Sequence, residues 1–297
     1  MRHPWFFGSV ASGVILLVGL YTSACGGNDG GGGTAPPFEA GTADTDGAVI
    51  DPPDAVIDPP DTNKPSKVNV TNHNINVAGD PRFYVLSVPK TYDASKKYPL
   101  IIAMHGDGQN ADGFRQFLGF DEITGDDAIT AYTDGVVDLF TDYDQNGDQQ
   151  LVEAVINELK GKLSIDSTKI WGFGYSKGGF IANELACRRP GLFTAITAHA
   201  TGGPQETSDK CPGILPIPIL LTQGDRDLNI GANFAAEYWA SVNGCGTNRV
   251  TSAPAECQKY TACPSSKPVV YCLAPGVSHF PIWNQATTVS WAFFRSL

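Results

Sequence analysis

The sequence predicts a three-layer α/β fold, in which helices cover both faces of a mainly parallel sheet and no large lid is inserted. Apolar runs of strand length alternate with segments of helical period, and the runs are continuously apolar, as in strands buried on both faces. One run leads into the pattern Gly-x-Ser-x-Gly at residues 174–178 and then into a helical segment. That strand-turn-helix order is typical of a nucleophile elbow.

The expected elements follow one another along residues 68–297. Each strand is an apolar run bounded by turn residues, and each helix repeats its apolar positions with a period near 3.6. Because catalytic loops in such sheets gather at the carboxyl ends of the strands, the segments that follow the strands are where chemistry is expected. The strands are expected at 83–89, 98–104, 128–132, 169–175, 195–199, 217–222 and 269–273, and the helices at 149–162, 177–188, 231–242 and 285–296.

The N-terminus has the pattern of an export signal. Arg2 and His3 precede an apolar run at 10–20 that is too short to span a bilayer, and small residues follow. We expect residues 1–24 to be removed, so that Cys25 becomes the first residue of a bacterial outer-membrane lipoprotein. A lipid on Cys25 would then anchor the protein to the membrane. Thr22 stands where that motif usually has Leu, so plain secretion is the alternative.

Residues 25–67 are rich in Gly, Pro and Asp and contain Ala-Val-Ile-Asp-Pro-Pro-Asp twice, at 48–54 and 55–61. This composition predicts a disordered, semi-extended tether, or a segment without a spacer role, before a catalytic domain at 68–297. The net charge of −11 argues against nucleic-acid binding, which needs a basic face. We expect a monomer.

Apart from Cys25, the cysteines form an even set that fits three disulfides in an oxidising compartment. A zinc site is the competing interpretation, but no Cys-x-x-Cys spacing and no neighbouring histidine pair supports it. Spacing alone leaves the connectivity open. The six residues are Cys187, Cys211, Cys245, Cys257, Cys263 and Cys272.

Ser176 is the candidate nucleophile, and it needs a base and an acid. Of the five histidines, His279 lies in the loop after the last predicted strand, where the base belongs in the chain order Ser, acid, His. Asp227 is the preferred acid, because the chain can turn at Gly224 and project that carboxylate from the strand end. Asp225 is the alternative, and both aspartates would otherwise simply line a solvated turn.

The oxyanion of the attacked carbonyl needs preorganised N–H donors. The Lys177 N–H is one by construction, since it begins the helix after the elbow. The second is expected from the turn that contains Gly106 and Asp107, directly after the strand at 98–104. We assign His105 to the shape of this turn rather than to proton transfer.

Four motifs, at 98–106, 172–179, 224–227 and 276–279, together resemble the secreted α/β-hydrolases grouped as polyhydroxybutyrate-depolymerase-like enzymes and feruloyl or acetylxylan esterases of carbohydrate esterase family 1. The resemblance implies an α/β-hydrolase fold over 80–297, with Ser176 as nucleophile, Asp227 as acid, His279 as base and Gly106-Asp107 as the oxyanion turn. It also implies a disulfide between Cys187 and Cys211. Lys177 departs from the Asn or Met that the family often has, and the Trp-Pro that often follows the histidine is missing.

The expected activity is that of an exported serine esterase acting on carboxylic esters, a cycle that requires no cofactor. The stretch 199–216, where many hydrolases insert a lid, is short, so we expect bulky or polymeric substrates such as feruloyl or acetyl polysaccharides or polyhydroxyalkanoate-like polyesters. A serine peptidase on the same fold and a catalytically silent cell-surface binding module are the alternatives.

Residues 142–153 fit the calcium-loop pattern D-x-[DN]-x-[DN]-G-x5-E. A calcium ion there would be structural, since nothing places it near Ser176. The simpler interpretation is an acidic turn that caps the following helix. The candidate ligands are Asp142, Asp144, Asn146, Asp148 and Glu153.

Overall fold

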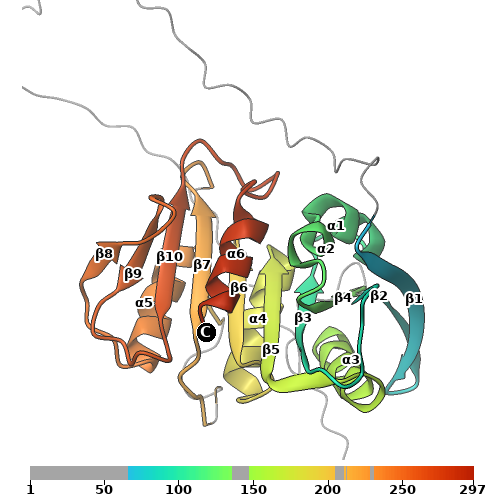
Figure 1. Ribbon diagram of the computed structural model, residues 1–297. Helices are drawn as coiled ribbons and strands as arrows, with labels where there is room; N and C mark the ends of the chain where they lie inside the picture. Colours follow the sequence, from blue (N-terminus) through green and yellow to red (C-terminus); the bar gives the residue numbers. More distant parts are fainter. Residues whose placement is uncertain (1–65, 136–146, 205–210, 212, 228–230) are drawn as a thin grey trace, which may run out of the picture. The chain divides into compact units, whose positions relative to one another are not determined.

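The computed structural model describes residues 66–135, 147–204, 211, 213–227 and 231–297. In these residues the strands form one ten-stranded sheet in the order β1-β2-β4-β3-β5-β6-β7-β10-β9-β8, which Figure 1 shows from right to left. The strands are β1 (Val68–Val77), β2 (Asp80–Pro89), β3 (Tyr98–Met104), β4 (Ile129–Thr133), β5 (Ile165–Tyr175), β6 (Ala195–His199), β7 (Ile219–Gly224), β8 (Arg249–Thr251), β9 (Cys257–Tyr260) and β10 (Val269–Ala274).

The middle of the sheet is parallel and its two edges are antiparallel. Strands β4, β3, β5, β6, β7 and β10 run in one direction, so their carboxyl ends lie along one edge of the sheet. Strands β2 and β1 continue the sheet antiparallel on one side, and β9 and β8 do so on the other. The loops that follow β3, β5, β7 and β10 therefore all leave from the same edge.

Helices cover both faces of the sheet. The buried residues of α3 (Gly147–Lys162), α4 (Lys177–Arg188) and α5 (Ala232–Val242) join one apolar cluster, and those of α1 (Ala111–Leu118), α2 (Phe120–Thr124) and α6 (Ala286–Arg295) join a second. Side chains alternate along β3 accordingly, with Ile102 in the first cluster and Ile101 in the second. This arrangement confirms the predicted three-layer α/β fold. No helix of the described residues is long and apolar enough to cross a membrane.

Strand β1 is absent from the sequence prediction, and its composition explains why. Most of its residues are polar and most of its side chains face solvent, so it lacks the apolar run that identifies a buried strand. It is an edge strand, paired along its whole length with β2. The sequence also did not predict helices α1 and α2. Strands β8 and β9 were missed too, because with three and four residues they are too short to show an apolar pattern.

Three disulfides lie in the described part of the chain. Cys187, on α4, is bonded to Cys211, the pair that the family resemblance implies. The other two disulfides flank the β8–β9 hairpin at the sheet edge, one joining Cys245 to Cys263 and the other joining Cys257 to Cys272. Cys257 and Cys272 also face each other across the β9–β10 ladder.

Candidate active site

Ser176 occupies a tight turn between β5 and α4. Its backbone has φ 52° and ψ −118°, a conformation that L-residues rarely adopt. The turn depends on the glycines on either side, because a Cβ at Gly174 would lie 2.3 Å from the carbonyl oxygen of Gly178, and one at Gly178 would lie 2.2 Å from that of Met104. The local sequence therefore holds the serine at the carboxyl edge of the sheet.

Three side chains from distant segments meet in one hydrogen-bonded row. The Ser176 Oγ lies 2.8 Å from His279 Nε2, and His279 Nδ1 lies 2.8 Å from Asp227 Oδ2. Since a carboxylate only accepts, the ring donates its Nδ1–H to Asp227 and leaves Nε2 to accept the serine hydroxyl proton. The Asp227 side chain is 5% exposed and that of His279 is 43% exposed. The row therefore has a buried acid at one end and an accessible serine–histidine pair at the other.

The loop after β7 also fixes the histidine loop. Asp225 does not approach the imidazole in this row; its Oδ1 accepts the Gly276 N–H at 2.8 Å. The Arg226 N–H donates to the Val277 carbonyl at 3.0 Å. Asp225, the alternative acid, thus binds the backbone of the segment that carries His279, while Asp227 contacts the ring itself.

Tyr175 is a neighbour of the row that sequence reasoning missed. Its hydroxyl donates to the His279 carbonyl at 2.5 Å, and the two rings stack with centroids 5.8 Å apart. The ring also lies against Gly106, where a Cβ would come within 3.0 Å of it. Burial, together with the charge of Asp227, raises the pKa of Tyr175 to about 12, so the hydroxyl remains a donor. The only signal in the sequence is its position immediately before the candidate nucleophile.

The two segments expected to bind the oxyanion are joined by an ion pair. Lys177 Nζ lies 2.8 Å from Asp107 Oδ2. The Gly106 N–H donates to Gln109 Oε1 at 2.9 Å, so it is already engaged. Among the described residues, the N–H groups of Asp107 and Lys177 have no hydrogen-bond acceptor. These two groups, rather than the Gly106 N–H, are the ones left to face a carbonyl oxygen.

His105 supports the turn that contains Gly106 and Asp107. Its ring is buried, Nε2 accepts the Gly135 N–H at 3.1 Å, and Nδ1 donates to the Gly106 carbonyl at 2.7 Å. Both nitrogens are therefore used within the fold.

His199 is fully buried between Thr222 Oγ1, 2.8 Å from Nδ1, and Ser290 Oγ, 2.9 Å from Nε2. Burial lowers the pKa of His199 to about 3, so this ring is neutral near pH 7 and does not reach Ser176. His73 lies on edge strand β1, stacked on Tyr84, and His3 lies outside the described residues. His279 is the histidine that the fold brings to the serine.

Only two of the five candidate calcium ligands lie in the described part of the chain. Asp142, Asp144 and Asn146 lie outside the described residues. Helix α3 begins at Gly147, so Asp148 is already helical, and its buried carboxylate pairs with Arg82. Glu153 faces Arg189, with 3.5 Å between the charged groups. Each of these two carboxylates thus lies near an arginine, and the described residues contain no cluster of three or more candidate metal ligands. The calcium site stays a prediction.

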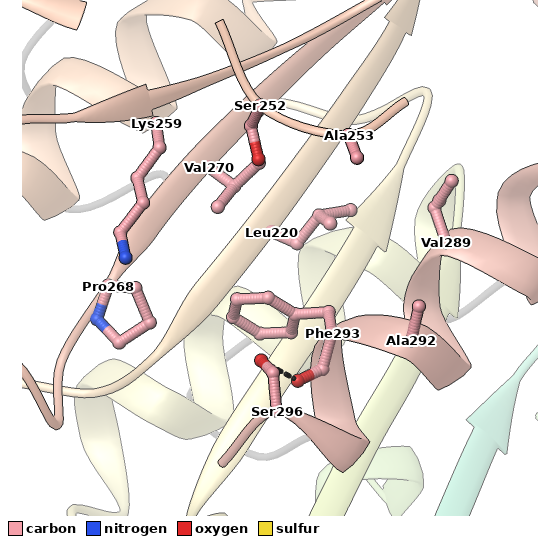
Figure 2. Close-up of a pocket in the computed structure, with 10 residues that line it drawn as sticks. All are labelled: Leu220, Ser252, Ala253, Lys259, Pro268, Val270, Val289, Ala292, Phe293 and Ser296. Carbon is pink, nitrogen blue, oxygen red and sulfur yellow. Dashed lines mark hydrogen bonds between the residues drawn. The ribbon is translucent and has the colours of Figure 1, made fainter. Parts of the chain in front are cut away.

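A separate hollow of about 220 Å³ lies on the sheet face beside α6 (Figure 2). Leu220 and Val270 form its floor, and Phe293 of α6 and Lys259 of β9 stand at its sides. Leu220 and Val270 are near the amino ends of β7 and β10, whereas the serine–histidine row lies beyond the carboxyl ends. This hollow is therefore not the site of the row.

Curated relatives are esterases. No protein-family model matches the chain. It is 30% identical to a probable feruloyl esterase C of Aspergillus flavus over 61% of this chain and 67% of that one, and 26% identical to feruloyl esterase B of Piromyces equi over 67% and 42%. The chain thus spans from 42% to 67% of the length of the curated relatives it matches.

Solved structures with the same fold include an acetyl xylan esterase from Aspergillus awamori. The TM-score is 0.61 and the sequences are 14% identical, with 76% of this chain and all of that chain covered. The feruloyl esterase module of Clostridium thermocellum, solved with sinapinate, gives a TM-score of 0.57 at 15% identity over 78% of this chain and 88% of the module. At these identities the likeness concerns the fold alone.

Proposed function

Because this chain belongs to the α/β-hydrolase esterases that include the feruloyl esterases, we propose that it is an exported serine esterase that hydrolyses carboxylic esters of bulky or polymeric alcohols. The observation that carries the proposal is the hydrogen-bonded row, in which Ser176 and Asp227 lie 2.8 Å from the two nitrogens of His279. A hydroxyl, an imidazole and a buried carboxylate in this order are the groups that acyl transfer from an ester requires.

In the proposed reaction His279 Nε2 takes the Ser176 proton while Oγ attacks the ester carbonyl. The carbonyl π electrons move to oxygen, and the N–H groups of Asp107 and Lys177 bind that oxyanion. When the tetrahedral intermediate collapses, the bond to the alcohol breaks and the imidazolium gives its proton to the leaving oxygen. Water, deprotonated by the same nitrogen, then attacks the acyl-enzyme; when this second intermediate collapses, the acid leaves and the imidazolium returns the proton to Ser176 Oγ. These groups complete the cycle without a cofactor.

For the substrate class, we favour acylated polysaccharides. The chain's curated relatives include proteins named feruloyl esterases, and its structural relatives include one named acetyl xylan esterase. The half-buried Ser176 and the His279 side chain, which is 43% exposed, support a site that bulky esters can reach. The stretch 199–216, which we expect to contain no lid, lies only partly among the described residues, because residues 205–210 and 212 are outside them. Polyhydroxyalkanoate-like polyesters are the alternative substrates that should be compared with acylated polysaccharides.

For the location, we infer export to an oxidising compartment. The three disulfides support it, because such bonds persist outside the reducing cytosol. The apolar run at 10–20 and the small residues before Cys25 supply the signal, and Cys25 is the proposed site of lipid attachment.

An active-serine fluorophosphonate probe tests the proposed nucleophile. It should label the protein and fail to label Ser176→Ala, since the probe reacts with a serine activated by a neighbouring base. Hydrolysis of feruloyl, acetyl-xylan, 3-hydroxybutyrate and peptide substrates is then measured on both proteins. An unlabelled wild-type protein would favour a silent binding module, and turnover of peptides without esters would favour a peptidase.

A further inference from the structure

The residue directly after the proposed catalytic histidine belongs to a pair of stacked aromatic rings. Phe280 follows His279 in the chain, and Phe117 comes from α1. The ring centroids are 6.1 Å apart and the planes make an angle of 18°. We propose that this pair, the Phe117–Phe280 platform, binds a sugar ring of the ester's alcohol part. The proposal rests on the proposed esterase function and adds the part of the substrate that the site recognises.

Phe280 is one of two largely exposed phenylalanines among the described residues, the other being Phe234 on α5. Phe280 is 63% exposed, and Phe117, on which it stacks, is half-buried. Leaving part of a phenylalanine ring in water forgoes some of its burial free energy, which a ligand that covers the ring would recover. Phe280 differs from the other exposed apolar side chains in stacking on a second ring directly after the proposed catalytic histidine, so that the two rings form a face that a ligand can cover.

The platform is held in place by its backbone. The Ser278 hydroxyl donates to the Phe280 carbonyl at 2.9 Å, and the Tyr175 hydroxyl donates to the preceding carbonyl, that of His279. Stacking on Phe117 fixes the ring itself. The ring is thus presented in one orientation, which reduces the entropy that binding must overcome.

The position of the platform identifies which part of the ester it contacts. His279 Nε2 delivers its proton to the leaving oxygen, so the alcohol must lie next to the imidazole during the reaction. The carbonyl oxygen points instead toward the N–H groups of Asp107 and Lys177. Phe280 adjoins the imidazole in the chain, so the alcohol is the part of the substrate that reaches it.

An open platform also suits a sugar better than an acyl group. Small apolar groups are usually bound in enclosed pockets, whereas this ring faces solvent. A pyranose or furanose ring can place its C–H face on the aromatic ring and keep its hydroxyls in water, and the polymer can continue on either side. A monosaccharide or oligosaccharide unit of an acylated polysaccharide fits these conditions.

Two esters of the same acid test the proposal. Methyl ferulate and a feruloylated arabinoxylo-oligosaccharide share the acyl group and differ only in the alcohol. Phe280→Ala should lower kcat/KM for the oligosaccharide about 5- to 10-fold, mainly through KM, and change that for methyl ferulate by less than about twofold. Phe280→Trp, which keeps an aromatic face, should retain the preference.

The matched control is Phe234→Ala. Phe234 is 74% exposed on α5, whose buried residues pack in the apolar cluster on the other face of the sheet. It should leave both substrates unaffected. An equal loss on both esters in Phe280→Ala, or a loss on methyl ferulate alone, would assign the ring to the acyl group or to the fold, and no loss on either would also overturn the proposal.

A binding measurement separates this proposal from the proposed function. In affinity gel electrophoresis with soluble arabinoxylan, Ser176→Ala should be retarded, and Ser176→Ala combined with Phe280→Ala should migrate about as in a gel without polysaccharide. If the two proteins are retarded equally, or if neither is retarded, the proposed sugar binding at the platform is wrong. If instead the wild-type protein hydrolyses no ester while this difference persists, the esterase function fails and the platform stands.

Discussion

Tyr175 contacts the three parts of the proposed catalytic apparatus. It precedes Ser176 in the chain, its hydroxyl donates to the His279 carbonyl, and its ring lies against Gly106 in the proposed oxyanion turn. The backbone at Ser176 is strained, so the position of Oγ relative to the imidazole depends on such neighbours. We therefore regard Tyr175 as a positioning residue for the serine–histidine pair.

Tyr175→Phe should lower kcat about 3- to 10-fold on a soluble ester, because it removes one hydrogen bond to the histidine loop and keeps the ring. KM should change by less than about twofold, since the hydroxyl is directed at the backbone and not at solvent. Steady-state kinetics with a thermal melt on the same protein provide the measurement. An unchanged kcat, or a loss of kcat that merely follows a loss of folded protein, would refute the positioning role.

The difference between the predicted and the missed residues has a physical basis. Ser176 could be singled out as the candidate nucleophile because the turn itself requires its glycines: a Cβ at Gly174 would lie 2.3 Å from the carbonyl oxygen of Gly178, four residues on. His279 and Asp227 could be ordered along the chain because the carboxyl ends of parallel strands share an edge. The contact between Asp225 and the Gly276 N–H joins two loops and depends on their exact packing, which no local pattern encodes. The hydrogen bond from the Gly106 N–H to Gln109 lies within one turn, but it depends on the side-chain conformation of Gln109, which the sequence does not specify.

At the scale of elements, apolar patterning predicted the buried parts of the fold. Strand β3 has the predicted bounds, Tyr98–Met104, because its buried run is apolar throughout and is bounded by turns. Strand β1 was missed because an exposed edge strand can be polar at most positions. The β8–β9 hairpin owes its structure partly to two disulfides, and their pairing could not be read from spacing.

The buried histidine His199 connects two strands of the sheet and the helix that covers them. His199 ends β6, its Nδ1 is 2.8 Å from Thr222 Oγ1 on β7, and its Nε2 is 2.9 Å from Ser290 Oγ on α6. The pKa of His199 is lowered to about 3 by burial, from the usual value of 6.5 in the unfolded chain. As the pH falls from 6.5 toward about 3, the imidazole of the unfolded state therefore binds a proton, whereas that of the folded state stays neutral.

This contact makes stability depend on pH in a defined direction. Above pH 6.5 the ring is neutral in both states and its contribution is fully present; between 6.5 and about 3 the contribution is progressively lost. From pH 7 to pH 5 the free energy of unfolding should fall by about 2 kcal/mol on this account. His199→Gln keeps polar contacts and does not titrate, so its unfolding free energy should fall less over the same range.

Urea unfolding of the two proteins at pH 7, 6 and 5 measures the difference. Titration of other groups affects both proteins alike, so the difference between the two slopes isolates His199. Parallel slopes would show that the ring titrates normally in the folded state. That result would contradict its burial between the two hydroxyls.

At the scale of the whole molecule, the main feature is the boundary between the N-terminal segment and the folded domain. We propose that residues 68–297 form the catalytic domain, that residues 25–67 tether it, and that residues 1–24 are the export signal. The boundary is supported by the first described contacts: the Ser66 hydroxyl accepts the Val68 N–H, and the Lys90 N–H donates to the Lys67 carbonyl. From Val68 onward, β1 pairs with β2 residue by residue.

A protein that begins at Ser66 should therefore retain the fold and the reaction of a protein that begins at Cys25. We expect melting temperatures within about 2 °C of each other and kcat on a soluble ester within about twofold, because the serine–histidine row and both apolar clusters lie after residue 66. The matched variant begins at Gly79 and so removes β1. It should melt lower or aggregate, since the edge of β2 is then exposed and Val77 is lost from its cluster. A loss of several degrees in the protein that begins at Ser66 would mean that earlier residues belong to the domain, and a stable, active protein from Gly79 would place the boundary after β1.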